Sequence, residues 1–166
     1  MRQQTRNLVY AAVIAALYVA LTHGQNLLLP NSASMAIQFR ASEALCVLAF
    51  FTPAAIPGLT IGCLLFNITN AAALPLDFLV GSLASLLAAA LMWKLRRHPA
   101  IGLAMPAVFN AVLVGWELAV YIGGGFWLNA LYVATGEMVV LYTLGWFLYA
   151  ALKQGNLYQR LFPNKP

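Results

Sequence analysis

The chain has 166 residues, of which 63% are hydrophobic and 8% are charged, and its mean hydropathy is +0.81. A soluble domain carries about 25% charged residues, so this composition excludes an ordinary soluble domain and indicates an integral membrane protein. At roughly 20 residues per span, the chain has room for six or seven helices at most. The net charge of +5 predicts no nucleic-acid partner, because the basic residues lie at the ends of apolar segments, where they orient a membrane protein.

We expect a single integral membrane domain over residues 1–166, with six transmembrane helices at about 8–22, 35–51, 54–70, 76–93, 100–121 and 128–152. Six spans place both termini on one side of the membrane. Eight of the nine basic residues then lie on that side: Arg2, Arg6, Lys94, Arg96, Arg97, Lys153, Arg160 and Lys165. Since basic loops stay in the cytoplasm, the predicted fold is an all-α membrane protein with both termini cytoplasmic.

The first apolar segment is short enough to be a signal peptide. We expect an uncleaved helix instead, because no small-residue cleavage site follows it and further spans do. Small residues recur in it at a spacing of four, which leaves a flat surface on which another helix can pack closely. The residues of this candidate partner interface are Ala11, Ala12, Ala15, Ala16 and Ala20.

The second predicted span carries Arg40 and Glu43, three residues apart. A charged side chain at membrane depth costs roughly 3 kcal/mol, so such residues face a protein interior or a wet cavity and usually mark a functional site. The alternative is an ion pair between positions i and i+3 of one helix, which would only hold helices together.

Orientation converts sequence position into depth, at about 1.5 Å per helical residue. All four acidic residues and Arg40 then fall in the outer half of the bilayer, on four different helices. Together with nearby polar and aromatic side chains they form the candidate substrate site: Arg40, Glu43, Asn67, Asp77, Asn110, Trp116, Glu117 and Glu137. A shared layer predicts a cavity open to the outside. For Asp77 a helix-capping role is an alternative. For Asn67 the alternative is capping of a helix end, and for Glu137 it is structural pairing.

The formal charge of this layer is −3, from four acids and one arginine. Such a cavity favours a planar, cationic or N–H-rich small molecule and disfavours an anion, since buried acceptors must be paired. The residues contain no nucleotide-binding loop, metal-ligand pattern or nucleophile–base motif. We therefore expect no catalytic residues, no metal ion and no cofactor; an intramembrane enzyme is a remote alternative. The two cysteines, Cys46 and Cys63, are interpreted as small buried hydrophobic residues.

Four spaced motifs resemble the QueT family, over most of residues 8–150: Gln38–Leu45, Ile56–Cys63 up to Asn67, Pro75–Ala84 and Asn110–Leu118. QueT proteins are substrate-binding S components of energy-coupling factor (ECF) transporters associated with uptake of queuosine precursors. The resemblance implies a six-helix S-component fold in a prokaryotic cell membrane, with a pocket facing outward. It also implies a complex with a transmembrane T component, contacted by the alanines of the first helix, and with two cytosolic ATPases, so that the chain itself is not an enzyme.

The ligand implied by the resemblance is a 7-deazaguanine, such as queuine or its aminomethyl precursor. Carried over to this chain, Glu43, Glu117 and Asn110 would bind the base, Arg40 would orient Glu43 and Trp116 could stack on the ring. Two rival hypotheses stay open: an S component for a different vitamin-like solute, and a membrane subunit without transport function whose buried charges assemble a complex.

Overall fold

The computed structural model describes residues 3–30, 32 and 37–162, which form helices joined by short turns. In chain order these are α1 (Gln3–Leu28), η1 (Ala41–Phe50), α2 (Ala55–Thr69), α3 (Asp77–Lys94), α4 (Pro99–Gly102), α5 (Met105–Tyr121), α6 (Phe126–Val140), η2 (Leu141–Gly145), α7 (Trp146–Lys153), η3 (Gln154–Asn156) and α8 (Leu157–Leu161). η1 and η3 are 3₁₀-helices, and η2 is a π-helical turn within the continuous stretch from α6 to α7. The predicted all-helical class is confirmed for the described residues.

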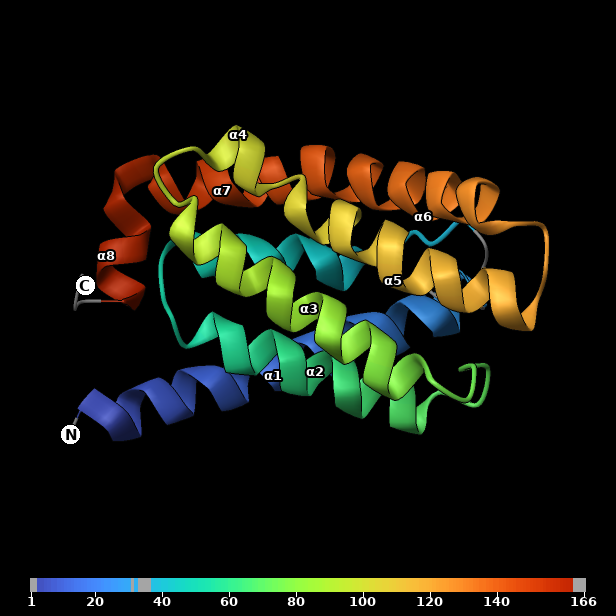
Figure 1. The fold of residues 1–166 in the computed structure, drawn as a ribbon. Coiled ribbons are helices and arrows are strands. Elements are labelled where there is room, and N and C mark those ends of the chain that lie inside the picture. The colour runs from blue at the N-terminus through green and yellow to red at the C-terminus, as the bar shows by residue number, and fades with distance from the viewer. Residues whose placement is uncertain (1–2, 31, 33–36, 163–166) are drawn as a thin grey trace.

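The long helices run side by side along the long axis of the molecule (Figure 1). α1 and α2 lie on one side, α6 and α7 on the other, and α3 and α5 between them (Figure 1). The short helix η1 is the central element, since it contacts α1, α2, α3, α6, α7 and η2. Eight of its ten residues are buried.

Four helical stretches are long and apolar enough to cross a membrane: Gln3–Leu28, Asp77–Lys94, Pro99–Tyr121 and Phe126–Leu161. The other two apolar helices are shorter. At about 2.0 Å per residue, the ten residues of η1 cover about 20 Å, less than the hydrocarbon core of about 30 Å. The helix predicted over 35–51 is therefore wrong at its start: residues 37–40 are not helical, and residues 35 and 36 lie outside the described part.

The ends of the other predicted helices also differ from those in the structure. α1 continues through the predicted loop start at residues 22–25, because Gly24 does not end a helix that is otherwise well formed, and it stops before Pro30. The third, fourth and fifth predicted spans correspond to α2, α3 and α4–α5 within a few residues, and α5 begins afresh at Met105 with Pro106 in its first turn. The sixth is longer than predicted and contains the π-helical turn.

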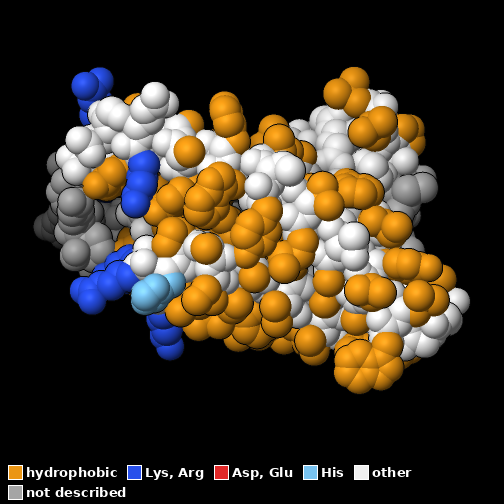
Figure 2. Space-filling view, turned by 90° about the horizontal axis from the view of Figure 1, so that it is seen from above, with side chains coloured by type: hydrophobic (Ala, Val, Ile, Leu, Met, Phe, Trp, Pro, Cys, Tyr) orange, Lys and Arg blue, Asp and Glu red, His pale blue; other side chains and the backbone are white. Residues whose placement is uncertain are grey.

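The start of α1 and the C-terminal helix α8 lie at the same end of the molecule (Figure 1). Basic side chains gather at that end on the face in Figure 2, and apolar side chains cover most of the rest. This distribution fits the charge pattern that led us to predict cytoplasmic termini. The direction of the protein in a membrane stays a prediction.

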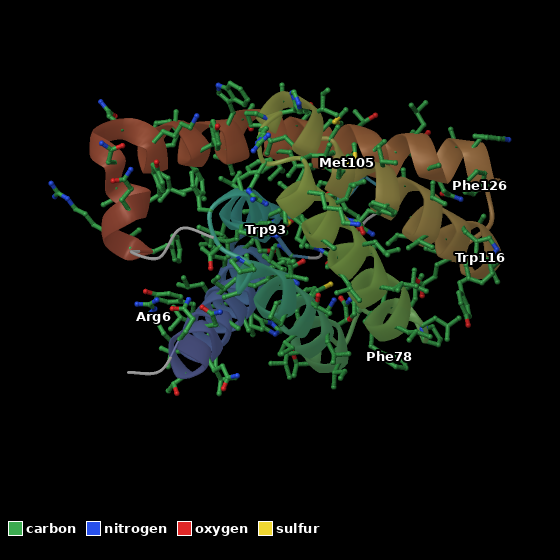
Figure 3. All side chains as sticks on the ribbon, turned by 60° about the vertical axis from the view of Figure 1, so that its left-hand side comes forward. Arg6, Phe78, Trp93, Met105, Trp116 and Phe126 are labelled. Carbon is green, nitrogen blue, oxygen red and sulfur yellow. The ribbon has the colours of Figure 1, made fainter. Side chains whose placement is uncertain are left out.

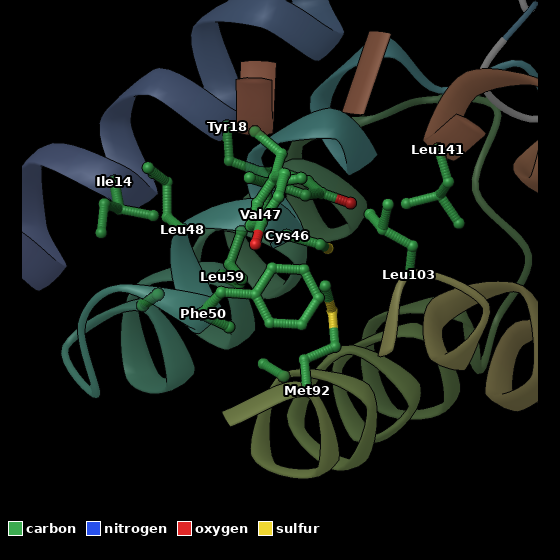
Figure 4. Close-up of a cluster of buried hydrophobic side chains, with 14 of the residues drawn as sticks. Ile14, Tyr18, Cys46, Val47, Leu48, Phe50, Leu59, Met92, Leu103 and Leu141 are labelled. Carbon is green, nitrogen blue, oxygen red and sulfur yellow. The ribbon is translucent and has the colours of Figure 1, made fainter. Parts of the chain in front are cut away.

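Two glycines let α1 and α2 approach closely. A Cβ on Gly58 would lie 2.9 Å from the carbonyl oxygen of Ala11, and one on Gly62 would lie 2.7 Å from the Cβ of Tyr18. The packing places Tyr18 in the main core, where it points toward the same buried cluster as Cys46 of η1 (Figure 4). Gly58 and Gly62 are four residues apart, the spacing at which small residues let two helices pack closely, and here that packing is within the chain.

We predict that Gly62→Ala lowers the melting temperature, because the added methyl group displaces Tyr18, and overpacking of this kind costs about 1–3 kcal/mol. The matched control is Gly24→Ala in α1, where an added Cβ meets nothing within 4 Å. That change should be neutral or stabilising by about 0.5–1 kcal/mol. Thermal unfolding of both variants in the same detergent is the measurement, and equal effects would contradict the close packing.

Candidate functional site

An extended segment, Gln38–Arg40, leads into η1 and is held by side chains on both sides. Gln25 of α1 donates hydrogen bonds to Ser32 Oγ and to the Phe39 carbonyl oxygen, and its Oε1 accepts from the Ala41 N–H at 2.7 Å. On the other side, a Cβ on Gly136 of α6 would lie 2.5 Å from the Gln38 carbonyl oxygen. Only glycine allows the backbone of the segment to lie directly on α6.

Tyr18 connects Arg40 to Glu43. The Tyr18 hydroxyl donates a hydrogen bond of 2.6 Å to Glu43 Oε1 and accepts a longer one, 3.4 Å, from Arg40. All three residues are buried, with Tyr18 completely so. Arg40 precedes the first residue of η1, so the alternative of an i, i+3 pair within one helix does not describe the backbone here. The expectation that Arg40 orients Glu43 takes another form here, since the two side chains meet through the tyrosine hydroxyl.

Both cysteine thiols belong to the same network. Cys46 donates to Glu43 Oε2 at 3.1 Å, and Arg40 lies 3.9 Å from Cys63 Sγ. The Arg40 guanidinium also lies over the ring of Phe66, 5.5 Å from its centroid. The interpretation of the cysteines as small buried hydrophobic residues is therefore incomplete. Both are buried, and their sulfur atoms also make polar contacts, Cys46 with Glu43 and Cys63 with Arg40.

Glu137 of α6 lies within electrostatic range of Glu43 and Arg40, and it has an open acceptor among the described residues. Its Oε1 accepts a hydrogen bond of 2.7 Å from Asn110 of α5, whereas its Oε2 is buried and has no partner. Glu43, by contrast, has a donor on each oxygen. We call Tyr18, Arg40, Glu43, Asn110 and Glu137 the buried charged cluster. With Arg40 and both glutamates ionised, its formal charge is −1.

Asp77 and Glu117 form a separate acidic pair. Glu117 is completely buried, its carboxyl lies beside Asp77, and in the described part of the chain neither of its oxygens has a hydrogen-bond partner. Asp77 is partly buried and accepts from the Leu74 N–H at 2.6 Å, which gives it a local structural role as well. The single polar layer predicted from sequence is thus divided into two groups. Asn67 lies between them, donating to the Asp77 carbonyl oxygen at 2.8 Å and to Cys63 Sγ at 3.5 Å.

Trp116 lies apart from both groups. Its side chain is 49% exposed, at the edge of the molecule near the end of α5 (Figure 3). Successive residues of a helix point about 100° apart, and here Glu117 faces inward while Trp116 faces outward. Stacking of a ligand on Trp116 has no support in this arrangement.

The alanines of α1 point in two directions. Ala11 and Ala15 are buried against α2, so they are unavailable to a partner in this conformation. Ala12, Ala16 and Ala20 are exposed along the opposite face. The prediction of a partner interface is narrowed to these three residues.

Sequence reasoning missed Tyr18, Gln25 and the roles of the two cysteines. A tyrosine in an apolar helix is normally interpreted as core packing, and no spacing links residue 18 to residues 40 and 43. Gly62, which makes room for Tyr18, was visible only as a packing signature.

We predict that Tyr18→Phe lowers the melting temperature by an amount equivalent to about 1–3 kcal/mol, because Glu43 Oε1 loses its donor in a buried site. The control is Tyr142→Phe, which removes an exposed hydroxyl that donates to the Ala100 carbonyl oxygen. Water replaces that bond, so the control should change little. Melting curves of the two variants side by side test this, and a shift of the same size in both would contradict a special role for the buried hydroxyl.

The comparisons with known proteins give one match. The family model described as QueT transporter matches residues 8–154. No curated protein and no solved structure gives a significant match. The family match covers most of the chain and includes every residue of the buried charged cluster and of the acidic pair. The chain therefore belongs to the QueT transporter family and is a membrane transport protein, not an enzyme.

Proposed function

We propose that the chain is the substrate-binding S component of an ECF transporter and that it captures a queuosine precursor from outside a prokaryotic cell. Membership of a transporter family supports the transport role. The observation that carries the proposal to a site is Glu137 Oε2, a buried carboxylate oxygen without a hydrogen-bond partner among the described residues. Glu117 has two such oxygens, but they lie beside the carboxyl of Asp77, whereas Glu137 lies beside the Asn110 amide and within electrostatic range of Arg40. An unmet acceptor in a protein interior costs about 1–3 kcal/mol, and a ligand that donates to it recovers that energy.

The chemistry of the cluster favours a ligand with N–H donors or a positive charge. Glu137 and Asn110 both belong to buried helix faces, and their remaining acceptor capacity matches adjacent N–H groups on the edge of a guanine-like ring. A cation also offsets the formal charge of −1 on the cluster. Queuine and its aminomethyl precursor, 7-aminomethyl-7-deazaguanine, have both features. Glu43 is already saturated, so we assign base recognition to Glu137 and Asn110 and a positioning role to Glu43, Tyr18 and Arg40.

The energy for uptake would come from partners, namely a transmembrane T component and two cytosolic ATPases. The exposed face of α1 offers a surface on which a partner helix can pack, because Ala12, Ala16 and Ala20 are small and lie one turn apart. With the basic end in the cytoplasm, this face lies in the membrane over much of its length.

We predict that 7-aminomethyl-7-deazaguanine or queuine raises the melting temperature of the purified protein, whereas guanine, riboflavin and thiamine raise it less or not at all. A ligand at 100 times its Kd stabilises by about 2.7 kcal/mol. Glu137→Gln should weaken binding about 10- to 100-fold, since a hydrogen bond to a charged group contributes about 1.5–3 kcal/mol.

The matched control for this experiment is Glu117→Gln, a second buried glutamate outside the cluster. It should keep most of the ligand-induced shift. Loss of the shift in both variants would restore Glu117 as a ligand contact beside Glu137, and an unchanged shift in Glu137→Gln would contradict the assignment to Glu137. A shift with another compound only would indicate an S component for a different solute, and no shift with any compound would favour the assembly subunit.

We further predict that Ala16→Leu reduces co-purification with the T component and ATP-driven uptake, while ligand-induced stabilisation persists, because the added side chain keeps the partner helix at a distance. Ala150→Leu is the control, an exposed alanine on α7. Unchanged uptake and assembly in Ala16→Leu would rule out this face as the docking surface.

A further inference from the structure

A groove at the end of the molecule opposite α8 lies close to the buried charged cluster. Its volume is about 620 Å³, and it is lined by the end of α1 with Pro30 on one side and by residues 69–72 on the other. This size is within the range of small-molecule sites, about 300–1,000 Å³. The groove contains none of the cluster residues.

Two residues that line this groove, Asn26 and His23, each carry a polar atom that accepts no hydrogen bond in the described part of the protein. Asn26 Oδ1 is buried and has no hydrogen-bond partner in the described part of the protein. His23 Nε2 lies 2.9 Å from Thr69 Oγ1, whose own proton is donated to the Leu65 carbonyl oxygen at 2.7 Å. Nε2 is therefore the donor to Thr69, and His23 Nδ1 is left as an acceptor. The groove thus suits a solute with N–H donors, the same class that suits Glu137.

A pair of aromatic rings separates the groove from the cluster. The His23 ring lines the groove and packs edge-on against Phe66, with 5.1 Å between the ring centroids. Phe66 is completely buried, and Arg40 of the cluster lies over its ring. From groove to cluster the order is therefore His23, Phe66, Arg40.

We propose that this groove is the entrance site for the solute and that the His23–Phe66 ring pair is the barrier between it and the buried charged cluster. The identity of the solute rests on the function proposed above. The barrier itself can be tested without any ligand. The His23 ring also donates a hydrogen bond to the Thr69 hydroxyl, but in this proposal the ring itself, and not this bond, closes the path. Displacement of that one ring opens the groove toward Phe66 and Arg40.

Cys63 reports on the barrier. It is completely buried, lies one turn before Phe66 on α2, and touches the Arg40 guanidinium. The parent for the experiment is Cys46→Ser, which leaves Cys63 as the single thiol and keeps a donor for Glu43. A charged thiol reagent dissolved in water then modifies Cys63 only through a water-filled path.

In this parent, His23→Ala should accelerate modification of Cys63 about tenfold, the factor expected from losing one aromatic ring pair. His23→Phe keeps a ring and loses the bond to Thr69, so it should stay slow. The control is His98→Ala, which changes the other histidine of the chain at the basic end. Equal rates in the parent, His23→Ala and His98→Ala would overturn the barrier, and so would fast modification in His23→Phe.

A binding arm separates the barrier from the proposed function. With 7-aminomethyl-7-deazaguanine as probe, His23→Ala should speed association and dissociation together and leave Kd within about threefold, since a barrier changes rates and a binding residue changes affinity. A large change in Kd with unchanged association would overturn the barrier role. If the protein with both cysteines intact binds no deazaguanine, the substrate assignment fails, and the rate of Cys63 modification in the Cys46→Ser parent still decides the barrier.

Discussion

The burial of Glu43 is the constraint on which the rest of this structure depends. An unpaired carboxylate in a protein interior is costly, and the two donors of Glu43 come from Tyr18 on α1 and Cys46 on η1. The Tyr18 hydroxyl reaches Glu43 because Gly62 lets α1 lie almost in backbone contact with α2. The close packing of α1 on α2 therefore also supplies the hydrogen-bond donor that the buried Glu43 needs, and both interactions fix the position of α1.

The non-helical backbone before η1 has the same origin. Irregular backbone at membrane depth is tolerated only where it is buried in protein or lines a wet cavity. Gln25 satisfies the Phe39 carbonyl and the Ala41 N–H, and Gly136 gives the segment a surface without side chains. Because the backbone groups on both sides of Arg40 are hydrogen-bonded in this way, Arg40 can adopt an extended conformation before η1. Its guanidinium then lies between the Tyr18 hydroxyl and the Phe66 ring.

The sequence predicts the class and the chemistry of this protein better than its geometry. Charge in apolar segments singled out Arg40, Glu43 and Glu137, which the fold buries, and hydropathy placed most helices within a few residues. The extended segment at residues 37–40 was not predictable, because an apolar run with two charges looks helical until its long-range partners are known. Trp116 was misplaced for a similar reason: sequence puts it beside Glu117, and only the packing of α5 decides which of the two faces inward. Nothing in the sequence around Tyr18 indicates its role, because its contact with Glu43 depends on how α1 packs on α2.

One face of α2 connects the parts of the molecule that carry its polar groups. Cys63 touches Arg40, Phe66 lies between Arg40 and His23, and Asn67 binds the start of α3 beside the acidic pair. These three residues are three and four positions apart, so they share a single helical face. A small rotation or shift of α2 therefore changes the groove, the cluster and the acidic pair at once. Since α2 also lies directly on α1, whose exposed alanines we propose as the partner surface, occupancy of the cluster and docking of a partner act on the same two helices. This shared element is a physical route by which a bound solute and a partner can influence each other.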